Sequence, residues 1–268
     1  MAKTTHHRVA KAARQTLPLA LLTLTLASGA PTSMQAEMSI PPSKVSTKPA
    51  APVSPPARVL SRPSVKEQPA IADTLLKQAP GLTADALRLA LKAAENAAQA
   101  GLVTRRELLT VIDYSLPSDK PRLFVFDLEQ KKLLFHELVA HGVNSGGNRT
   151  TRFSNVENSR ATSLGLFVTA NTYFGSNGYS LRLRGLDQGF NDQALARAIV
   201  MHGAPYVSEA TIKSLGRLGR SWGCPAVPAK VSKKIIDQLK GGSPIFAYYP
   251  DPEWLKSSRF LRGDSARS

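Results

Sequence analysis

Cysteine is almost absent from this chain: its 268 residues contain one, Cys224. A single cysteine excludes an intrachain disulfide, so the fold is not a disulfide-stapled scaffold. The sequence also lacks the cysteine and histidine spacing of a zinc site and the Gly-Lys-Ser/Thr loop that holds nucleotide phosphates. These absences argue against zinc-binding modules and P-loop nucleotide enzymes.

Acidic residues are also scarce: 19 Asp and Glu stand against 35 Lys and Arg, which gives a formal net charge of +16. A basic surface favours an anionic polymer such as cell wall, a membrane surface or nucleic acid, although charge also simply keeps a surface solvated. The chain has no run in which basic and aromatic residues are interleaved. We therefore predict no nucleic-acid partner.

Long apolar runs are missing as well. The run Leu17–Ala27 is too short to span a bilayer, and no other segment approaches that length. No acidic residue precedes Glu37, and the basic residues before the run are Lys3, Arg8, Lys11 and Arg14. This layout is typical of a secretory signal peptide, which we predict over residues 1–30, with export to the periplasm or cell-wall space and no membrane anchor after cleavage. An uncleaved anchor or an amphipathic transit segment is the alternative.

Two segments of different composition follow. Residues 31–70 are rich in Pro, Ser, Ala and Lys without apolar periodicity, which predicts a disordered linker. Residues 71–115 predict a small helical module, in which Thr83 is the N-cap of one helix. The capping-box pattern Thr-x-x-Glu at 104–107 predicts a further helix that runs through Ile112.

Residues 116–250 show the short apolar runs of β-strands. Turn residues at 129–131 predict a hairpin between the first two strands. The expected strands are 122–128, 132–141, 165–170, 180–186, 198–202 and 245–249. Ser208 and Gly216 bracket one predicted helix, and Pro228 starts another. We predict a mainly β domain with short helices, followed by a tail, 251–268, that either docks on the domain or is loose.

The unpaired Cys224 is a candidate nucleophile. Exported proteins usually keep cysteines in disulfides, and one left over is either a reactive thiol or an intermolecular link. His202, at the end of a predicted strand, supplies a base that can take the thiol proton. Gly203 lets the backbone turn and leaves a carbonyl that can orient the imidazole. The alternative is a structural cysteine and an unrelated structural histidine.

The residues around the thiol fit the same hypothesis. The N–H groups of Gly223 and Cys224 can converge on one point and form an oxyanion hole. Arg217 and Arg220 add positive potential, which favours the thiolate. We therefore predict that this glycine- and arginine-rich loop supports a reactive cysteine.

These residues resemble a known family. The pair His202-Gly203, followed by Ser-Trp-Gly-Cys at 221–224, is similar to the signature of L,D-transpeptidases of the YkuD type. The segment Thr-Ser-Leu-Gly-Leu-Phe at 162–167 resembles the Thr-Pro-x-Gly-x-Phe segment that precedes the active-site histidine in that family. Over about 122–248, roughly half of the chain, the sequence looks most like the branch of murein L,D-transpeptidase catalytic-domain proteins.

The resemblance implies an L,D-transpeptidase-like β-sandwich and a cysteine acyltransferase that needs no metal or organic cofactor. It implies that the Cys224 thiolate attacks the third residue of a peptidoglycan tetrapeptide stem, and that D-Ala leaves with a proton from His202. An amine of a neighbouring stem then receives the acyl group, which gives a 3-3 cross-link. Water as the acceptor would give an L,D-carboxypeptidase, and a lysine of an acceptor protein is a third possibility. Carbapenems trap such thiols in this family.

The motif also departs from its commoner form, which has Ser/Thr-His-Gly-Cys and an Asn or Arg two residues after the cysteine. Trp222 and Ala226 stand at these two positions. The second histidine of the motif is therefore missing, and His202 is left as the obvious base. Trp222 either forms an apolar wall of the site or belongs to the core, and Ser221 is expected to hold the loop by hydrogen bonds.

Four more residues are candidates for the cleft. His141, in a second His-Gly pair, is an alternative base or a substrate-side residue. Tyr173 is a candidate oxyanion donor, as the resemblance implies, or an aromatic that packs on the sheet. Arg182 and Arg184 alternate on a predicted strand and share a face, where they either bind a stem carboxylate or are solvated.

Two other functions stay open at this point. A cysteine peptidase or amidase would use the same pair of residues. A non-catalytic wall-binding protein would keep the fold with a degenerate site, and the Trp222 and Ala226 departures are its best support.

Overall fold

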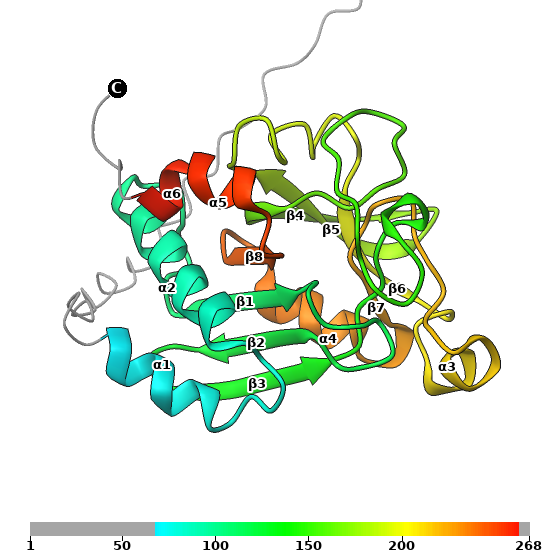
Figure 1. Cartoon of the computed structure of the whole chain (residues 1–268), viewed down its shortest axis with the longest axis horizontal. Helices are drawn as coiled ribbons and strands as arrows, with labels where there is room; N and C mark the ends of the chain where they lie inside the picture. Colours follow the sequence, from blue (N-terminus) through cyan, green and yellow to red (C-terminus); the bar gives the residue numbers. More distant parts are fainter. Residues whose placement is uncertain (1–67, 263–268) are drawn as a thin grey trace, which may run out of the picture. The chain divides into compact units, whose positions relative to one another are not determined.

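The structure is a computed structural model that describes residues 68–262. The predicted signal peptide and nearly all of the predicted linker lie outside the described residues. The described strands are β1 (Leu108–Asp113), β2 (Leu123–Asp127), β3 (Lys132–Glu137), β4 (Gly165–Gly175), β5 (Gly178–Gly185), β6 (Val200–Ala204), β7 (Ala226–Pro228) and β8 (Pro244–Tyr248). The helices are α1 (Gln68–Leu76), α2 (Ala84–Gln99), the 3₁₀ turn η1 (Val143–Ser145), α3 (Glu209–Leu215), α4 (Ala229–Leu239), α5 (Pro252–Ser257) and α6 (Arg259–Arg262) (Figure 1).

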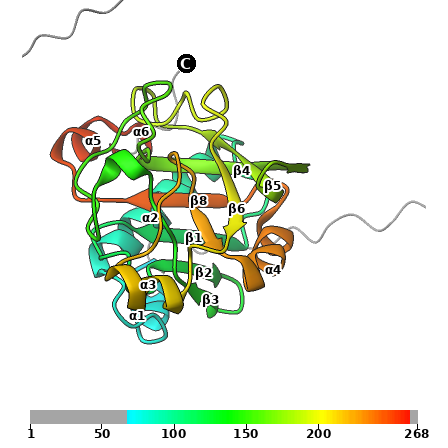
Figure 2. The ribbon, with the colours of Figure 1, turned by 90° about the vertical axis from the view of Figure 1, so that its right-hand side faces the viewer.

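All of these strands belong to one sheet. Its order is β3-β2-β1-β8-β4-β5-β6-β7, and the succession from β3 to β4 can be followed in Figure 2. Neighbours are antiparallel except for β1 with β8 and β6 with β7, which are parallel. The predicted mainly β fold with short helices is therefore confirmed, and its strands form one continuous sheet.

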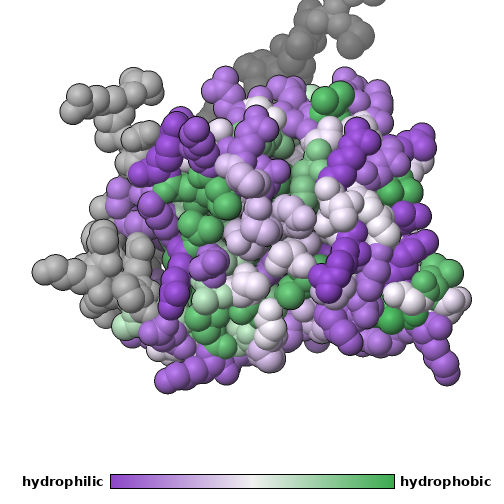
Figure 3. Space-filling model, in the orientation of Figure 1, coloured by the Kyte–Doolittle hydropathy of each residue, from purple (hydrophilic) through white to green (hydrophobic). Residues whose placement is uncertain are grey.

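The sheet has a buried core on each face. Along β1, Leu109 and Val111 join the core that α1, α2, α5 and α6 cover, whereas Leu108 and Ile112 join the core that α4 covers. This alternation follows from the two-residue period of a strand. Figure 3 shows the face toward the viewer in Figure 1, where hydrophilic residues surround several small apolar patches, as on an ordinary solvated surface.

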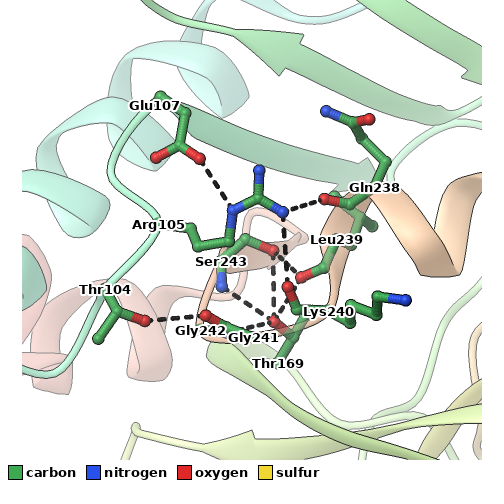
Figure 4. A network of polar contacts seen from close by, with 10 residues as sticks. All are labelled: Thr104, Arg105, Glu107, Thr169, Gln238, Leu239, Lys240, Gly241, Gly242 and Ser243. Carbon is green, nitrogen blue, oxygen red and sulfur yellow. Dashed lines mark hydrogen bonds and ion pairs between the residues drawn. The ribbon is translucent and has the colours of Figure 1, made fainter. Parts of the chain in front are cut away.

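The third helix predicted through Ile112 is wrong, because these residues form β1 in the middle of the sheet. The predicted capping residues have other partners (Figure 4). Thr104 Oγ1 donates to the Gly241 carbonyl at 2.9 Å, and Glu107 accepts from Arg105 Nε at 2.8 Å. The run after Glu107 is buried on both faces and rich in branched residues, which favours a strand over a helix. The predicted division at 115/116 therefore placed a strand of the sheet in the helical module.

Other predicted helix ends are confirmed. Thr83 caps α2 by accepting from the Ala86 N–H at 3.4 Å, and its hydroxyl also donates to Asp113 of β1 at 2.8 Å. Ser208 caps α3, and Gly216 ends it in the left-handed region. α1 begins at Gln68, so the last residues assigned to the linker are helical.

The described part of the tail, residues 251–262, docks on the domain. Trp254 and Phe260 are buried in the core that α2 covers, and Asn96 of α2 donates to the Phe260 carbonyl at 2.7 Å. No helix within residues 68–262 is long and apolar enough to cross a membrane.

Candidate active site

The parallel pair β6–β7 places the two predicted catalytic residues. His202 lies in the middle of β6, in register with Ala226 of β7 and with Ser180 of β5. Cys224 comes two residues before Ala226, at the end of the loop that enters β7. The two candidates therefore lie on adjacent segments of the same edge of the sheet.

Cys224 is half-buried, and its sulfur lies beside the start of β6. Its Sγ accepts from the Val200 N–H at 3.5 Å and donates to the Ala198 carbonyl at 3.8 Å. Burial raises the pKa of the thiol, while the Val200 N–H and the charge of Arg197 act in the opposite direction. Because the net shift is upward, the thiol rests protonated at neutral pH and needs a base to become a nucleophile.

His202 is 4% exposed, and its Nδ1 lies 3.1 Å from the Gly203 carbonyl oxygen. A carbonyl only accepts, so Nδ1 carries the proton of the neutral ring and Nε2 keeps a lone pair. Burial lowers the pKa of the imidazole, with the Gly203 bond opposing. The ring is therefore neutral at pH 7, which is the state a general base requires.

Among the hydrogen bonds of the described residues, none joins the His202 imidazole to the Cys224 thiol. The bonds of the sulfur go to Val200 and Ala198, at the beginning of β6. Catalytic contacts are often long in unliganded sites and tighten when substrate binds. The role of His202 as base stays a prediction.

His141, the alternative base, has both ring nitrogens engaged. Its Nδ1 accepts from Arg122 Nη2 at 2.7 Å, so Nε2 bears the proton and faces the Gly146 carbonyl at 3.4 Å. Burial and the Arg122 charge lower the pKa of His141 to about 4. Its own carbonyl accepts from the Ser221 N–H at 3.0 Å. This geometry gives His141 a supporting place beside the cysteine loop and leaves no nitrogen free to take the proton of Cys224.

Ser221 holds the cysteine loop from within. Its Oγ donates to the Cys224 carbonyl at 2.6 Å and accepts from the Gly223 N–H at 3.1 Å. The Gly223 N–H is therefore engaged inside the loop, which leaves the Cys224 N–H as the predicted oxyanion donor. Gly223 has φ +122°, and a Cβ there would lie 2.8 Å from the Ala161 carbonyl oxygen, so the turn requires glycine.

The two arginines expected to favour the thiolate have other partners. Arg220 donates to the carbonyls of Gly146 and Val143, at 2.9 and 3.3 Å, and Arg217 donates to the neighbouring Leu218 carbonyl at 2.7 Å. Arg220 thus supports the segment beside the cysteine loop.

The cation that does act on the thiol is Arg197, which sequence reasoning missed. It lies 27 positions before the cysteine. No motif marks it, because the folding of the 154–163 loop brings the two groups together.

Tyr173 lies on the same face of the sheet as His202. It is in register with Ser180, which is in register with His202, and residues directly opposite each other share a face. Two strand spacings, roughly 10 Å, therefore separate Tyr173 from His202. The Arg182 guanidinium stacks 4.3 Å from the Tyr173 ring centroid, and Arg182 and Arg184 are both exposed on β5. The substrate-side roles of these three side chains stay predictions.

Trp222 is 70% exposed, so the alternative that it belongs to the core is wrong. The Arg160 guanidinium lies 4.4 Å from its ring centroid. The indole therefore forms part of the surface next to Gly223 and Cys224. Within residues 68–262 there is no group of three or more His, Cys, Asp or Glu side chains that could hold a metal ion.

A family model described as the L,D-transpeptidase catalytic domain matches residues 78–248, which include β6, β7, Cys224 and His202. The chain therefore belongs to the L,D-transpeptidase catalytic-domain family. The match begins inside the predicted helical module, at residue 78. A search of the curated proteins finds no match.

Several solved structures of L,D-transpeptidases are similar to the chain. One from Mycobacterium smegmatis is 16% identical over 53% of this chain and 59% of its own, with a TM-score of 0.33. One from Xylanimonas cellulosilytica is 18% identical over 75% of this chain and 100% of its own, with a TM-score of 0.31. L,D-transpeptidase 3 from Mycobacterium tuberculosis, in complex with a faropenem-derived adduct, is 15% identical over 53% and 60%, with a TM-score of 0.31.

Proposed function

We propose that the chain is a peptidoglycan L,D-transpeptidase in which Cys224 is the nucleophile and His202 the base. The observation that supports this most strongly is the state of His202. Its Nδ1 is held by the carbonyl of its own strand, and Nε2 is left to accept a proton beside the segment that carries the thiol. Membership of the family supplies the reaction class.

The first half of the reaction forms an acyl-enzyme. His202 Nε2 takes the thiol proton, and the Cys224 sulfur adds to the carbonyl carbon of the third stem residue. The carbonyl oxygen becomes an oxyanion, for which the Cys224 N–H and the Tyr173 hydroxyl are the proposed donors. The oxyanion then collapses, the peptide C–N bond breaks, and the departing D-Ala nitrogen receives the proton from His202. A thioester and free D-Ala result.

The second half transfers the acyl group. A neutral amine of a neighbouring stem attacks the thioester carbon while His202 takes one of its protons. The C–S bond breaks, and the proton returns to the Cys224 sulfur. Water in place of the amine gives a trimmed stem, and a protein lysine in its place gives an attached protein. All three outcomes use the same acyl-enzyme, so the chemistry before this step is common to them.

The pair rests as neutral thiol and neutral imidazole. Burial raises the pKa of Cys224 and lowers that of His202, so at pH 7 each group is in its uncharged form. Proton transfer therefore accompanies attack, and the thiol must leave its contact with the Val200 N–H to approach the imidazole. The exposed Trp222 and the Tyr173–Arg182 stack are the proposed walls for the stem peptide.

Muropeptide analysis tests this function. The purified protein is incubated with sacculi, which are then digested and separated. We expect loss of tetrapeptide stems with release of D-Ala and appearance of 3-3 cross-linked dimers. Tripeptide stems without dimers would assign the carboxypeptidase reaction instead, and cleavage of other bonds would assign a peptidase or amidase.

Two variants serve as controls for the sacculus experiment. Cys224→Ala should abolish every product. His136→Gln removes an imidazole that stacks on Phe124 of β2, far along the sheet order from β6, and should leave the product pattern unchanged. Unchanged sacculi with the wild-type protein, or full activity in Cys224→Ala, would refute the proposal.

The non-catalytic alternative is tested by trapping the thiol. A nucleophilic thiolate adds to the carbonyl of a carbapenem β-lactam, the C–N bond breaks, and the ring nitrogen takes the proton, so the protein gains the mass of the whole drug. An adduct on the peptide that contains Cys224 excludes a degenerate site. A protein that folds and binds sacculi but gains no mass supports the wall-binding alternative. Export to the cell-wall space is part of the proposal and rests on residues 1–30, outside the described residues.

A further inference from the structure

Arg197 lies in the turn between β5 and β6, and the proposed mechanism does not use it. Its guanidinium is half-buried and binds the 154–163 segment. Its acceptors are the Ser154 carbonyl at 2.7 Å, the Ser163 hydroxyl at 2.5 Å, the Ser159 hydroxyl at 3.1 Å and the Ala161 carbonyl at 2.7 Å. The fifth donor, Nε–H, is buried with no partner in the described part of the chain.

All of these acceptors are neutral. A buried or half-buried arginine is normally paired with a carboxylate, because a charge taken out of water is costly when nothing compensates it. Within residues 68–262 the ion pairs of the protein involve other cations, and Arg197 takes part in none of them. The guanidinium therefore keeps its full positive charge, held in place by oxygens that do not neutralise it.

This charge lies directly beneath the cysteine turn. A Cβ built on Gly223 would be 3.3 Å from Arg197 Nη2, and it would be 2.8 Å from the Ala161 oxygen that Nη2 binds. The guanidinium, the Ala161 carbonyl and the Gly223 backbone are thus packed against one another. Cys224 is the next residue along the chain.

Two tyrosines whose pKa responds to the Cys224 charge, Tyr114 and Tyr206, are neutral at pH 7. Burial raises the pKa of Tyr206 to about 12 and that of Tyr114 further, and the Cys224 charge adds to both shifts. His202 is neutral because burial lowers its pKa. Arg197 and Cys224 each act on the pKa of the other in the direction of an attractive pair.

We propose that Arg197 is a positioning residue of the Cys224 site: its uncompensated charge stabilises the thiolate as it forms, and its hydrogen bonds fix the turn that carries the sulfur. Arg217 and Arg220 also donate to neutral carbonyls, and Arg197 differs from them in lying against the backbone of Gly223, the residue before the thiol. The importance of this role for catalysis rests on the proposed function, but the ionisation of the thiol can be measured without it.

The test is the pH dependence of Cys224 alkylation by iodoacetamide, followed by intact mass. In Arg197→Gln the midpoint should move up by about one to two pH units, as for loss of a nearby opposite charge. Because the thiolate is the reactive form, alkylation below the midpoint should slow about tenfold per unit. Arg197→Lys keeps the charge and should keep the midpoint close to wild type, although it loses several hydrogen bonds.

Arg88→Gln is the matched control, because it removes an exposed arginine of α2 that pairs with Asp73. It should change neither the midpoint nor the rate. Thermal unfolding followed by circular dichroism shows that each variant is folded at the temperature of the assay. A folded Arg197→Gln protein with the wild-type midpoint, or equal shifts in Arg197→Gln and Arg197→Lys, would overturn the proposal.

A second variant keeps Arg197 in place, for the case in which its removal unfolds the protein. Ser159→Asp gives the guanidinium a carboxylate partner where it now binds a hydroxyl. The alkylation midpoint should rise in Ser159→Asp and stay unchanged in Ser159→Asn. An unchanged midpoint in Ser159→Asp contradicts the inference. If the wild-type protein is inactive on sacculi but the alkylation midpoints of the variants shift as expected, only the transpeptidase proposal is rejected. If the wild-type protein is active and no midpoint shifts, only the role of Arg197 is rejected.

Discussion

The two His-Gly pairs of this chain, His202-Gly203 and His141-Gly142, look equivalent in sequence and differ in the structure. Both imidazoles are almost fully buried, and both flank the cysteine loop. In the first pair one ring nitrogen is held by a backbone carbonyl and the other keeps its lone pair. In the second pair Arg122 donates to one nitrogen, and the other carries the proton toward Gly146.

The difference teaches that the tautomer, and not the dipeptide, decides which histidine can act as a base. A carbonyl neighbour fixes a proton on the ring and frees the opposite nitrogen, whereas an arginine neighbour consumes the lone pair itself. Burial, together with the charge of the same arginine, also lowers the pKa of His141, which suits a neutral structural side chain.

The largest expected effect is the difference in the rate of Cys224 acylation between variants of the two histidines. His202→Gln should lower the rate of Cys224 acylation by a carbapenem at pH 7 by about 10²–10⁴-fold, the usual contribution of a general base. His141→Gln should leave the rate of the folded protein within a few-fold of wild type, because the amide can accept from Arg122 and donate to Gly146. Intact mass against time gives both rates. Similar losses in the two variants would contradict the distinction.

The next effect concerns stability in acid. The folded pKa of His141 is about 4, below its ordinary value of 6.5, so the unfolded chain binds the extra proton first. The stabilising contribution is fully present above pH 6.5 and is lost as the pH falls toward 4, by about 3 kcal/mol for a shift of this size. His202 acts in the same direction.

Urea unfolding between pH 7 and pH 4 measures this loss. His141→Gln cannot titrate, so its free energy of unfolding should fall less over the same range than that of the wild type. Parallel curves for the two proteins would show that the pKa of His141 is not lowered in the folded protein.

The smallest expected effect is the change in stability when the glycine of each His-Gly pair, Gly142 or Gly203, is replaced. A Cβ at Gly142 would lie 2.5 Å from the backbone oxygen of Arg160, whereas a Cβ at Gly203 would lie 2.5 Å from Ser232 Oγ. Both alanine substitutions should destabilise the protein, by about 1–3 kcal/mol for overpacking. Only the second obstacle is a side chain, so Ser232→Ala should recover part of the loss in Gly203→Ala. Thermal unfolding of the single and double variants measures these losses. If Ser232→Ala recovers no stability in Gly203→Ala, the prediction is contradicted.

Sequence reasoning found much of this arrangement because local signals marked it. The ends of α3 follow from residue types at fixed positions, and β6, which carries His202, follows from a short apolar run. β1 was missed because a capping-box pattern precedes a run that is buried on both faces. A strand buried in this way carries no alternation to distinguish it from a helix.

The supporting contacts could not be predicted in the same way. Arg197 approaches Cys224 only through the fold of the 154–163 loop, and Arg122 reaches His141 across 19 positions of sequence. The engagement of the Gly223 N–H by Ser221 depends on the exact path of the turn. Such contacts are set by tertiary packing, which no local pattern encodes.

The most direct test of the central claim, that His202 serves Cys224 as its base, is the pH profile of carbapenem acylation in the wild type, His202→Gln and His141→Gln. A base must be unprotonated to act, so the acylation rate of the wild type should rise with pH through a midpoint below 6.5. The His141→Gln variant should show the same rise. The His202→Gln variant should lack this rise, and its rate should increase only at higher pH, where the thiol ionises. A rise below pH 6.5 that survives in His202→Gln and disappears in His141→Gln would contradict the account.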